Sequence, residues 1–72
     1  MNFAERIKLL RIERGLKQTD LAKAFGITSR QYQNYEYGKQ TPDFKTLAII
    51  ADYFNVSVDY LMGRTDKPEL NR

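Results

Sequence analysis

Four side chains between positions 29 and 34 have the types and the spacing to read the edges of nucleic-acid bases. Hydroxyl, guanidinium and amide groups hydrogen-bond to base edges, and this segment carries them at Ser29, Arg30, Gln33 and Asn34. If the segment is a helix, Tyr32 and Tyr35 point to one side and leave the four polar residues on the outer surface. A helix that only served a core would not need that polar set. The pattern therefore predicts a helix that reads DNA.

The residues before this helix predict the element that would hold it in place. A helix from 18 to 25 would have one inward apolar stripe, formed by Leu21, Ala22 and Phe25. Gly26 then stands where the backbone needs a left-handed residue, and Thr28 can cap the helix that follows. Together these signals predict a helix-turn-helix.

Composition excludes most other classes of function. The chain has 72 residues, of which 42% are hydrophobic, so it has room for one small domain and is too apolar for disorder. It contains neither cysteine nor histidine, which removes disulfides, thiol and imidazole catalysis and the usual zinc sites. No apolar run approaches the ~20 residues of a membrane span, and the N-terminus lacks the design of a secretion signal. We therefore expect a cytoplasmic protein that is no enzyme and holds no metal or cofactor.

Basic residues are concentrated in the first part of the chain. Up to Lys45 there are nine basic and five acidic residues, whereas from Thr46 onward three basic residues face four acidic ones. The positive part is also the part with the helix-turn-helix pattern. Such a distribution favours a polyanion that docks on that part.

The helix at the N-terminus and the end of the DNA-reading helix have clear local signals. The first helix begins after Asn2 and ends at about Arg14, where Gly15 stops it. Its inner stripe consists of Phe3, Ile7 and Leu10. The DNA-reading helix runs from 29 to about 37 and stops at Gly38.

A fourth helix is predicted to start at Pro42, with Thr41 as its N-cap, and to run to Phe54. Asn55 then takes the left-handed closing position that Gly usually fills. The inward residues of this helix are Phe44, Leu47, Ile50, Ala51 and Phe54.

A last short helix completes the predicted architecture. Ser57 caps it, and it runs through Met62 to the stop at Gly63. No repeat, linker or alternating strand pattern occurs in the chain. The sequence therefore predicts an all-α fold with five short helices around one core, a domain over 1–63, and a polar, frayed tail over 64–72.

Several pieces of the chain from Arg6 to Met62 occur in register with one known family. They are RIKLLR, GLKQTDLA, FGIT, YEYGKQTP and TLAIIADYFNVSVDYL. With them the chain resembles the phage repressor/Cro helix-turn-helix family, also called the xenobiotic-response-element or XRE family. The resemblance implies a lambda-repressor-like domain that binds double-stranded DNA sequence-specifically. It further implies a bacterial or phage-encoded transcriptional regulator, a repressor that acts as a dimer on a palindromic operator.

The resemblance also implies roles for individual residues. The base-reading positions of the family match Ser29, Arg30, Gln33 and Asn34. The phosphate-binding positions match Gln18, Thr28, Gln31, Lys39 and Gln40. A buried ion pair between the first and third helices matches Arg11 and Glu36. Two alternatives stay open, since Arg30 can contact phosphate instead of guanine and Asn34 can be an ordinary surface residue.

Three features depart from the family pattern. Lys17 stands where Ser or Thr usually caps the second helix, and Asn55 replaces a common Gly. The chain also ends where longer relatives continue into an oligomerisation or sensing domain. The first two departures concern stability, and the third leaves the regulatory signal open.

Apolar residues at usually polar positions support a rival interpretation. Leu9 and Ile12 lie away from the inner stripe of the first helix, and Ile49 occupies a usually polar position of the fourth. With these residues as an interface, the chain would be a protein-interaction module of antitoxin-like or anti-repressor type. For a homodimer, the resemblance points to the last helix, around Val58 and Tyr60, where exposed aromatic area needs cover.

Overall fold

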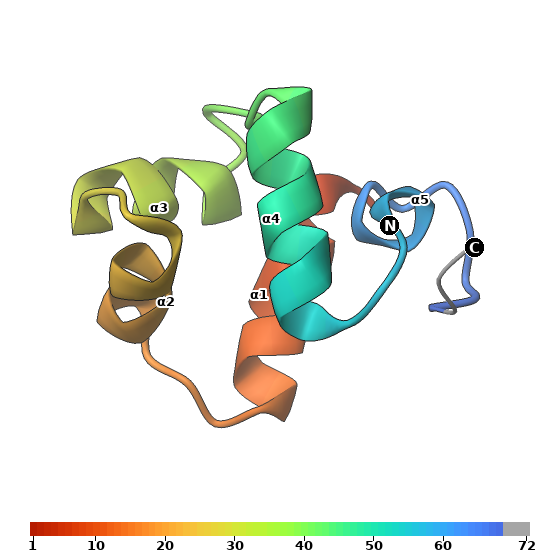
Figure 1. Ribbon diagram of the computed structural model, residues 1–72, viewed down its shortest axis with the longest axis horizontal. Coiled ribbons are helices and arrows are strands. Elements are labelled where there is room, and N and C mark those ends of the chain that lie inside the picture. The colour runs from red at the N-terminus through yellow and green to blue at the C-terminus, as the bar shows by residue number, and fades with distance from the viewer. Residues whose placement is uncertain (69–72) are drawn as a thin grey trace.

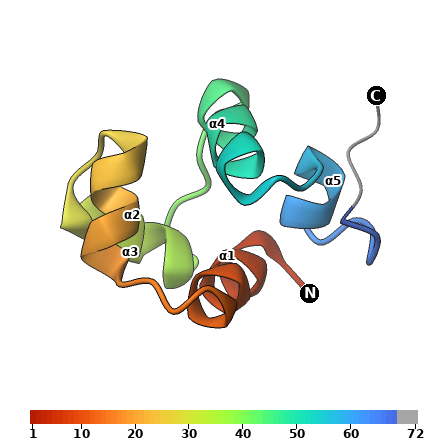
Figure 2. The ribbon, with the colours of Figure 1, turned by 60° about the horizontal axis from the view of Figure 1, so that its bottom comes forward.

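The computed structural model describes residues 1–68 and shows five helices and no strand in that range. They are α1 (Phe3–Glu13), α2 (Gln18–Phe25), α3 (Ser29–Glu36), α4 (Phe44–Phe54) and α5 (Val58–Leu61). α2 and α3 form one end of the molecule, α5 and the N-terminus lie at the other, and α1 and α4 run between them (Figures 1 and 2). This arrangement confirms the all-α fold of five short helices. None of the five is both long and apolar enough to cross a membrane.

Several helix ends follow signals that are local in the sequence. Asn2 caps α1, because its side chain accepts the N–H of Glu5 at 2.9 Å and the Glu5 carboxylate accepts the N–H of Asn2 at 3.3 Å. Asn55 closes α4 in the left-handed conformation, with φ of +57°. Ser57 caps α5 by accepting the N–H of Tyr60 at 3.0 Å. The predictions at these three ends are confirmed.

The predicted start of α4 is wrong by two residues. Asp43, and not Thr41, caps the helix by accepting the N–H of Thr46 at 2.9 Å, and Pro42 lies outside it. A carboxylate interacts favourably with the positive end of the helix dipole, which favours Asp over Thr at this position. Phe44 becomes the first helical residue and is 74% exposed, so its predicted place in the core is also wrong.

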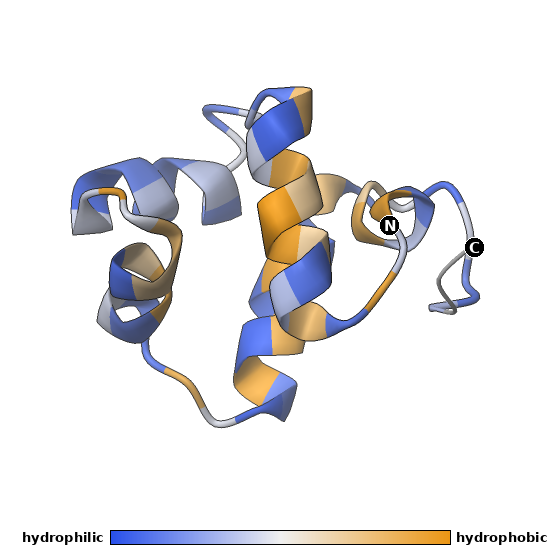
Figure 3. Ribbon diagram, viewed as in Figure 1, coloured by the Kyte–Doolittle hydropathy of each residue, from blue (hydrophilic) through white to orange (hydrophobic). Residues whose placement is uncertain are grey.

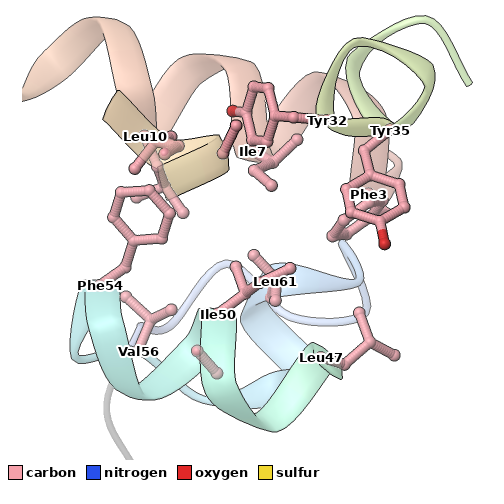
Figure 4. Close-up of a cluster of buried hydrophobic side chains, with 13 residues drawn as sticks. Phe3, Ile7, Leu10, Tyr32, Tyr35, Leu47, Ile50, Phe54, Val56 and Leu61 are labelled. Carbon is pink, nitrogen blue, oxygen red and sulfur yellow. The ribbon is translucent and has the colours of Figure 1, made fainter. Parts of the chain in front are cut away.

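One apolar core lies between α1 and α4 (Figure 4). Its largest fully buried side chains are Ile7, Leu21, Tyr32, Ile50, Phe54 and Leu61. Ring contacts connect three helices across the core: Phe3 meets Tyr35 at 6.0 Å between ring centroids, and Tyr35 meets Tyr32 at 6.4 Å. Tyr32 in turn contacts Phe25 of α2 at 6.4 Å. The tyrosines of α3 thus hold it against α1 and α2 and leave its other face free.

A buried arginine, which the sequence did not predict, joins α1 to α5. Arg6 is only 5% exposed, and its guanidinium lies 3.8 Å from the ring centroid of Tyr60. The signal in the sequence is its spacing, because Arg6 lies on the same side of α1 as Phe3 and Leu10. Burial of a cation there depends on the Tyr60 ring, which comes from a distant part of the chain.

The tail that the sequence predicts to fray is folded back as far as Pro68. Asp66 Oδ1 lies 3.6 Å from Arg6 Nη2, and the N–H of Ser57 donates to the carbonyl of Pro68 at 3.1 Å. These contacts give the position of this part of the tail and not its motion, so fraying stays a prediction. Its remainder, 69–72, lies outside the described residues.

Candidate nucleic-acid interface

A tight turn fixes α3 beside α2. Gly26 closes α2 with φ of +68°, and the N–H of Ile27 donates to the carbonyl of Ala22 at 3.0 Å. Thr28 then caps α3, because its hydroxyl accepts the N–H of Gln31 at 3.1 Å. The turn has the residues in the roles that the sequence predicts for them, and the two helices form a helix-turn-helix.

The inner face of α3 is buried, and its outer face is polar. Tyr32 and Tyr35 fill the inner face, with 0% and 4% of their surface exposed. The residues predicted to read bases share the remaining surface: Arg30 is exposed, and Ser29, Gln33 and Asn34 are half-buried. Hydropathy colouring shows α3 in shades of blue along its length, whereas α4 has strongly hydrophobic bands (Figure 3). The structure therefore places the four predicted base-reading side chains on one helix face.

The N-terminus of α2 offers hydrogen-bond donors to an anion. Within residues 1–68, no other group occupies the backbone N–H groups of Gln18 and Thr19, the first two residues of α2. The N–H of Lys17, by contrast, is bonded to the carboxylate of Asp20 at 2.9 Å, while the Lys17 side chain, which stands where Ser or Thr is usual, accepts no N–H of α2. Free N–H groups and the helix dipole together favour a phosphate at such a helix end.

The other predicted phosphate-binding residues lie at the two ends of α3. Thr28 is exposed and Gln31 half-buried at its start. Lys39 and Gln40 lie in the exposed loop after α3, and both of their N–H groups donate to the carbonyl of Asn34, at 2.9 and 3.3 Å. Candidate phosphate contacts thus flank the outer face of α3, with the candidate base contacts between them.

Glu36, at the end of α3, accepts hydrogen bonds from three helices. Arg11 donates to it from Nε at 2.6 Å and from Nη2 at 3.2 Å. Gln18 Nε2 donates at 3.1 Å, and the Tyr32 hydroxyl donates from one turn earlier in α3. Arg11 Nη1 also donates to the carbonyl of Leu16 at 3.1 Å. We refer to Arg11, Gln18, Tyr32 and Glu36 as the Glu36 cluster; it joins α1, the segment before α2, α2 and α3.

The Glu36 cluster contains a charged pair at neutral pH. Burial alone would raise the pKa of Glu36, but the hydrogen bonds from Arg11, Tyr32 and Gln18 outweigh burial and hold that pKa below its usual value. The bond to Glu36 raises the pKa of Arg11. Burial, with the bond to Glu36, raises the pKa of the Tyr32 hydroxyl, which therefore stays protonated and donates.

Sequence reasoning missed part of this cluster. The sequence predicts only that Tyr32 points to the inner side of its helix, whereas the structure shows its hydroxyl buried and bonded to Glu36. The spacing of Tyr32 and Glu36 by four residues was the available signal. Gln18 is predicted only as a phosphate contact, and its bond to Glu36 spans 18 positions, which no local pattern indicates.

The three apolar residues proposed as a protein interface are exposed but do not share one surface. Leu9, Ile12 and Ile49 are 37%, 55% and 46% exposed. By helical spacing, Ile12 lies opposite the buried stripe of α1, and Ile49 opposite that of α4. Because α1 and α4 lie on opposite sides of the core, these two faces point away from each other (Figures 2 and 4). The three residues therefore cannot line one flat surface.

The last helix offers less free aromatic surface than the sequence suggests. Tyr60 is half-buried, and the guanidinium of Arg6 covers its ring. Val58 is also half-buried and packs against the core. The cover that Tyr60 was expected to need from a second copy comes from its own chain.

Comparisons with known proteins agree with this geometry. Residues 7–61 match the family model described as helix-turn-helix. The SPbeta prophage-derived uncharacterized HTH-type transcriptional regulator YonR of Bacillus subtilis (strain 168) is 41% identical over 63 residues, covering 88% of this chain and 58% of YonR. The cryptic phage CTXphi transcriptional repressor RstR of Vibrio cholerae is 31% identical, covering 89% of this chain and 58% of RstR. The crystal structure of a transcriptional regulator from Listeria innocua is similar with a TM-score of 0.82 and 36% identity, covering 85% of this chain and 57% of that one.

The chain thus spans somewhat more than half the length of these relatives. The matched residues include the whole of α2, α3, α4 and α5, and α1 from Ile7 onward. The family model therefore covers the helix-turn-helix and the helices that support it. By this match and by its fold, the chain belongs to the XRE-type helix-turn-helix family.

Proposed function

We propose that this chain is a transcriptional regulator that binds double-stranded DNA sequence-specifically. The observation that carries the proposal is the arrangement around α3, where donors at the start of α2 and at both ends of α3 flank a polar outer face. Phosphate contacts at the flanks fix the register of a helix on a duplex, and the face between them then meets base edges in the major groove. No catalytic step and no cofactor enter this proposal.

Each predicted residue has a defined part in that docking. The phosphate contacts come from Gln18, Thr28, Gln31, Lys39 and Gln40. The base contacts come from Ser29, Arg30, Gln33 and Asn34. Among these, Arg30 and Asn34 lie one turn apart on the same side of α3, with a guanidinium suited to guanine and an amide suited to adenine.

We further propose that the regulator is a repressor that acts as a dimer on a palindromic operator in the bacterial cytoplasm. Four base-reading side chains are few for tight operator binding, and a two-fold dimer doubles them. The repressor role is supported by the similarity to RstR, which is named a transcriptional repressor. YonR, which is prophage-derived, supports a phage or bacterial setting.

Selection of bound duplexes from a random pool tests the proposal. The enriched sites should be pseudo-palindromes whose half-site centres lie about one helical turn, ~10 bp, apart. Because several phosphates are neutralised per subunit, log affinity for the selected duplex should fall steeply with log salt concentration.

Two results would count against the proposal at different levels. An enriched site without two-fold symmetry, occupied by one chain, would contradict the dimer but leave DNA binding intact. A pool without enriched duplexes would contradict the function itself. A salt-insensitive complex with a protein, lost on changing Leu9 and Ile12 to polar residues, would then favour the interaction-module alternative.

A further inference from the structure

We propose that Glu36 is a positioning residue for DNA binding, which fixes the side-chain amide of Gln18 for its contact with phosphate. The inference rests on the proposed function and adds a role for a residue that would not itself touch DNA. It starts from the hydrogen bond between Gln18 Nε2 and Glu36 Oε1, at 3.1 Å. This bond connects the helix end proposed to bind phosphate with the end of the helix proposed to read bases.

The chemistry of the two groups determines how the amide is oriented. An ionised carboxylate only accepts hydrogen bonds, so the nitrogen of the Gln18 amide, and not its oxygen, must face Glu36. One of the two N–H groups of the amide is used in that bond. The second N–H remains available, as do the backbone N–H groups of Gln18 and Thr19, which no group within residues 1–68 occupies. Fixing the amide therefore leaves three N–H donors at the start of α2 that can bind the oxygens of one phosphate.

Because Glu36 is negatively charged, this arrangement can bind phosphate only if Arg11 offsets that charge. A carboxylate one hydrogen bond away from a phosphate site repels the phosphate unless a cation offsets its charge. Arg11 offsets it with two bonds to the same carboxylate, and Arg11 also donates to the carbonyl of Leu16, two residues before α2 begins. The same cation thus neutralises Glu36 and fixes the backbone that leads into α2.

A double-mutant cycle of Gln18 and Glu36, measured as affinity for the duplex, tests the proposal. The variants are Glu36→Gln, Gln18→Ala and the double variant, each measured as the full chain against the selected duplex at a temperature where all are folded. A glutamine at position 36 has one acceptor oxygen, which charged Arg11 takes first, so its NH2 group faces Gln18 and the nitrogen of the Gln18 amide loses its acceptor. We expect Gln18→Ala to weaken affinity about tenfold and Glu36→Gln about fivefold, with no further loss from Glu36→Gln in the Gln18→Ala background.

The sign of the Glu36→Gln effect separates positioning from simple electrostatics. The variant is more positive by one unit, and charge alone would tighten its binding to a polyanion. Tighter or unchanged binding, or losses that add in the double variant, would overturn the inference and leave the DNA-binding proposal standing. Unchanged binding by Gln18→Ala would also overturn it, because Gln18 would then make no phosphate contact. Failure of the unaltered protein to bind any duplex would overturn both.

A core variant controls for loss of stability. Ile7→Val removes one buried methylene from a fully buried side chain that lies in the core and outside the Glu36 cluster. It should lower the melting temperature while its affinity for the duplex stays within twofold of that of the unaltered protein. If Ile7→Val weakens binding as much as Glu36→Gln, the effect of Glu36 is one of stability and the inference is wrong.

A second measurement uses the unaltered protein, so it does not require that any variant folds. The two side-chain amide hydrogens of Gln18 can be followed by NMR with and without the duplex. We expect one of them, bonded to Glu36, to exchange slowly with water in both states, and the other to shift when the duplex is added. Equal, fast exchange of both hydrogens in the free protein would overturn the inference.

Discussion

Two arginines of α1 are shielded from solvent in different ways. Arg11, in the last turn, donates two hydrogen bonds to Glu36 and one to a backbone carbonyl. Arg6, in the first half, stacks on Tyr60. Within residues 1–68, its Nε has no hydrogen-bond partner and its one ion pair is with Asp66, at 3.6 Å. The Asp66 side chain is fully exposed, whereas the Glu36 side chain is 2% exposed.

The comparison indicates when the removal of a buried charge costs much stability. Removing Arg11 would leave a buried carboxylate without its cation, which is costly. Removing Arg6 would leave only Asp66, which water already solvates. The two regions therefore differ mainly in the carboxylate that is left when the arginine is removed, which is buried at one end and exposed at the other. They differ less in how deeply the arginine itself is buried. We expect the α2–α3 end to tolerate charge changes poorly and the α5 end to tolerate them well.

The largest expected effect follows the loss of Arg11. Arg11→Met strands Glu36 and should lower the free energy of unfolding by ~3–5 kcal/mol, as measured by urea denaturation. The double variant Arg11→Met/Glu36→Leu replaces both charges with apolar groups and should cost less than the sum of the single changes. Small, additive losses would show that the pair is ordinary surface charge.

Acid should act on the same end of the molecule, with a smaller effect, because protonation neutralises Glu36 but keeps it hydrogen-bonded. The pKa of Glu36 is lowered from 4.5 in the folded chain, so its stabilisation is fully present above that pH and is lost as the pH falls through the folded pKa. Unfolding free energies between neutral pH and pH ~3 should fall less steeply in Glu36→Gln than in the unaltered protein. Some slope should remain, since hydrogen bonds with Thr46 lower the pKa of Asp43. Equal slopes would contradict the role given to Glu36.

The smallest expected effect concerns Arg6. Arg6→Met gives up the stacking on Tyr60 but also removes an unpaired buried N–H group, so the net loss should be about 1 kcal/mol or less. Asp66→Asn serves as the matched control and should leave the melting temperature unchanged, because that carboxylate is exposed. A loss from Arg6→Met as large as that from Arg11→Met would remove the contrast between the two ends.

The sequence predicted the helices well where their ends depend on near neighbours. Asn2, Gly26 and Asn55 act through backbone groups within four positions, and each does what its residue type indicates. At the start of α4 the sequence predicted Thr41 as the cap, whereas Asp43, two residues later, caps the helix. Local signals thus give the number of helices more firmly than the first residue of each.

Contacts between distant segments could be predicted only in part. Resemblance to a family indicated the pairing of Arg11 with Glu36, but not the hydrogen bonds that Gln18 and Tyr32 add to the same carboxylate. The burial of Arg6 was missed because its charge suggests a surface position and its cover belongs to another helix. Such contacts depend on the packing of several helices, which no short window of sequence contains.

Competition against single-base variants of the selected site tests most directly whether α3 reads DNA. Arg30→Ala and Asn34→Ala should each relax preference at one base pair per half-site, with a loss of ~1–3 kcal/mol of discrimination there. Gln18→Ala should weaken binding to all variants by a similar factor and leave the preferred sequence unchanged, as expected of a phosphate contact. If Arg30→Ala and Asn34→Ala both keep the base preferences of the unaltered protein, α3 is not the reading helix.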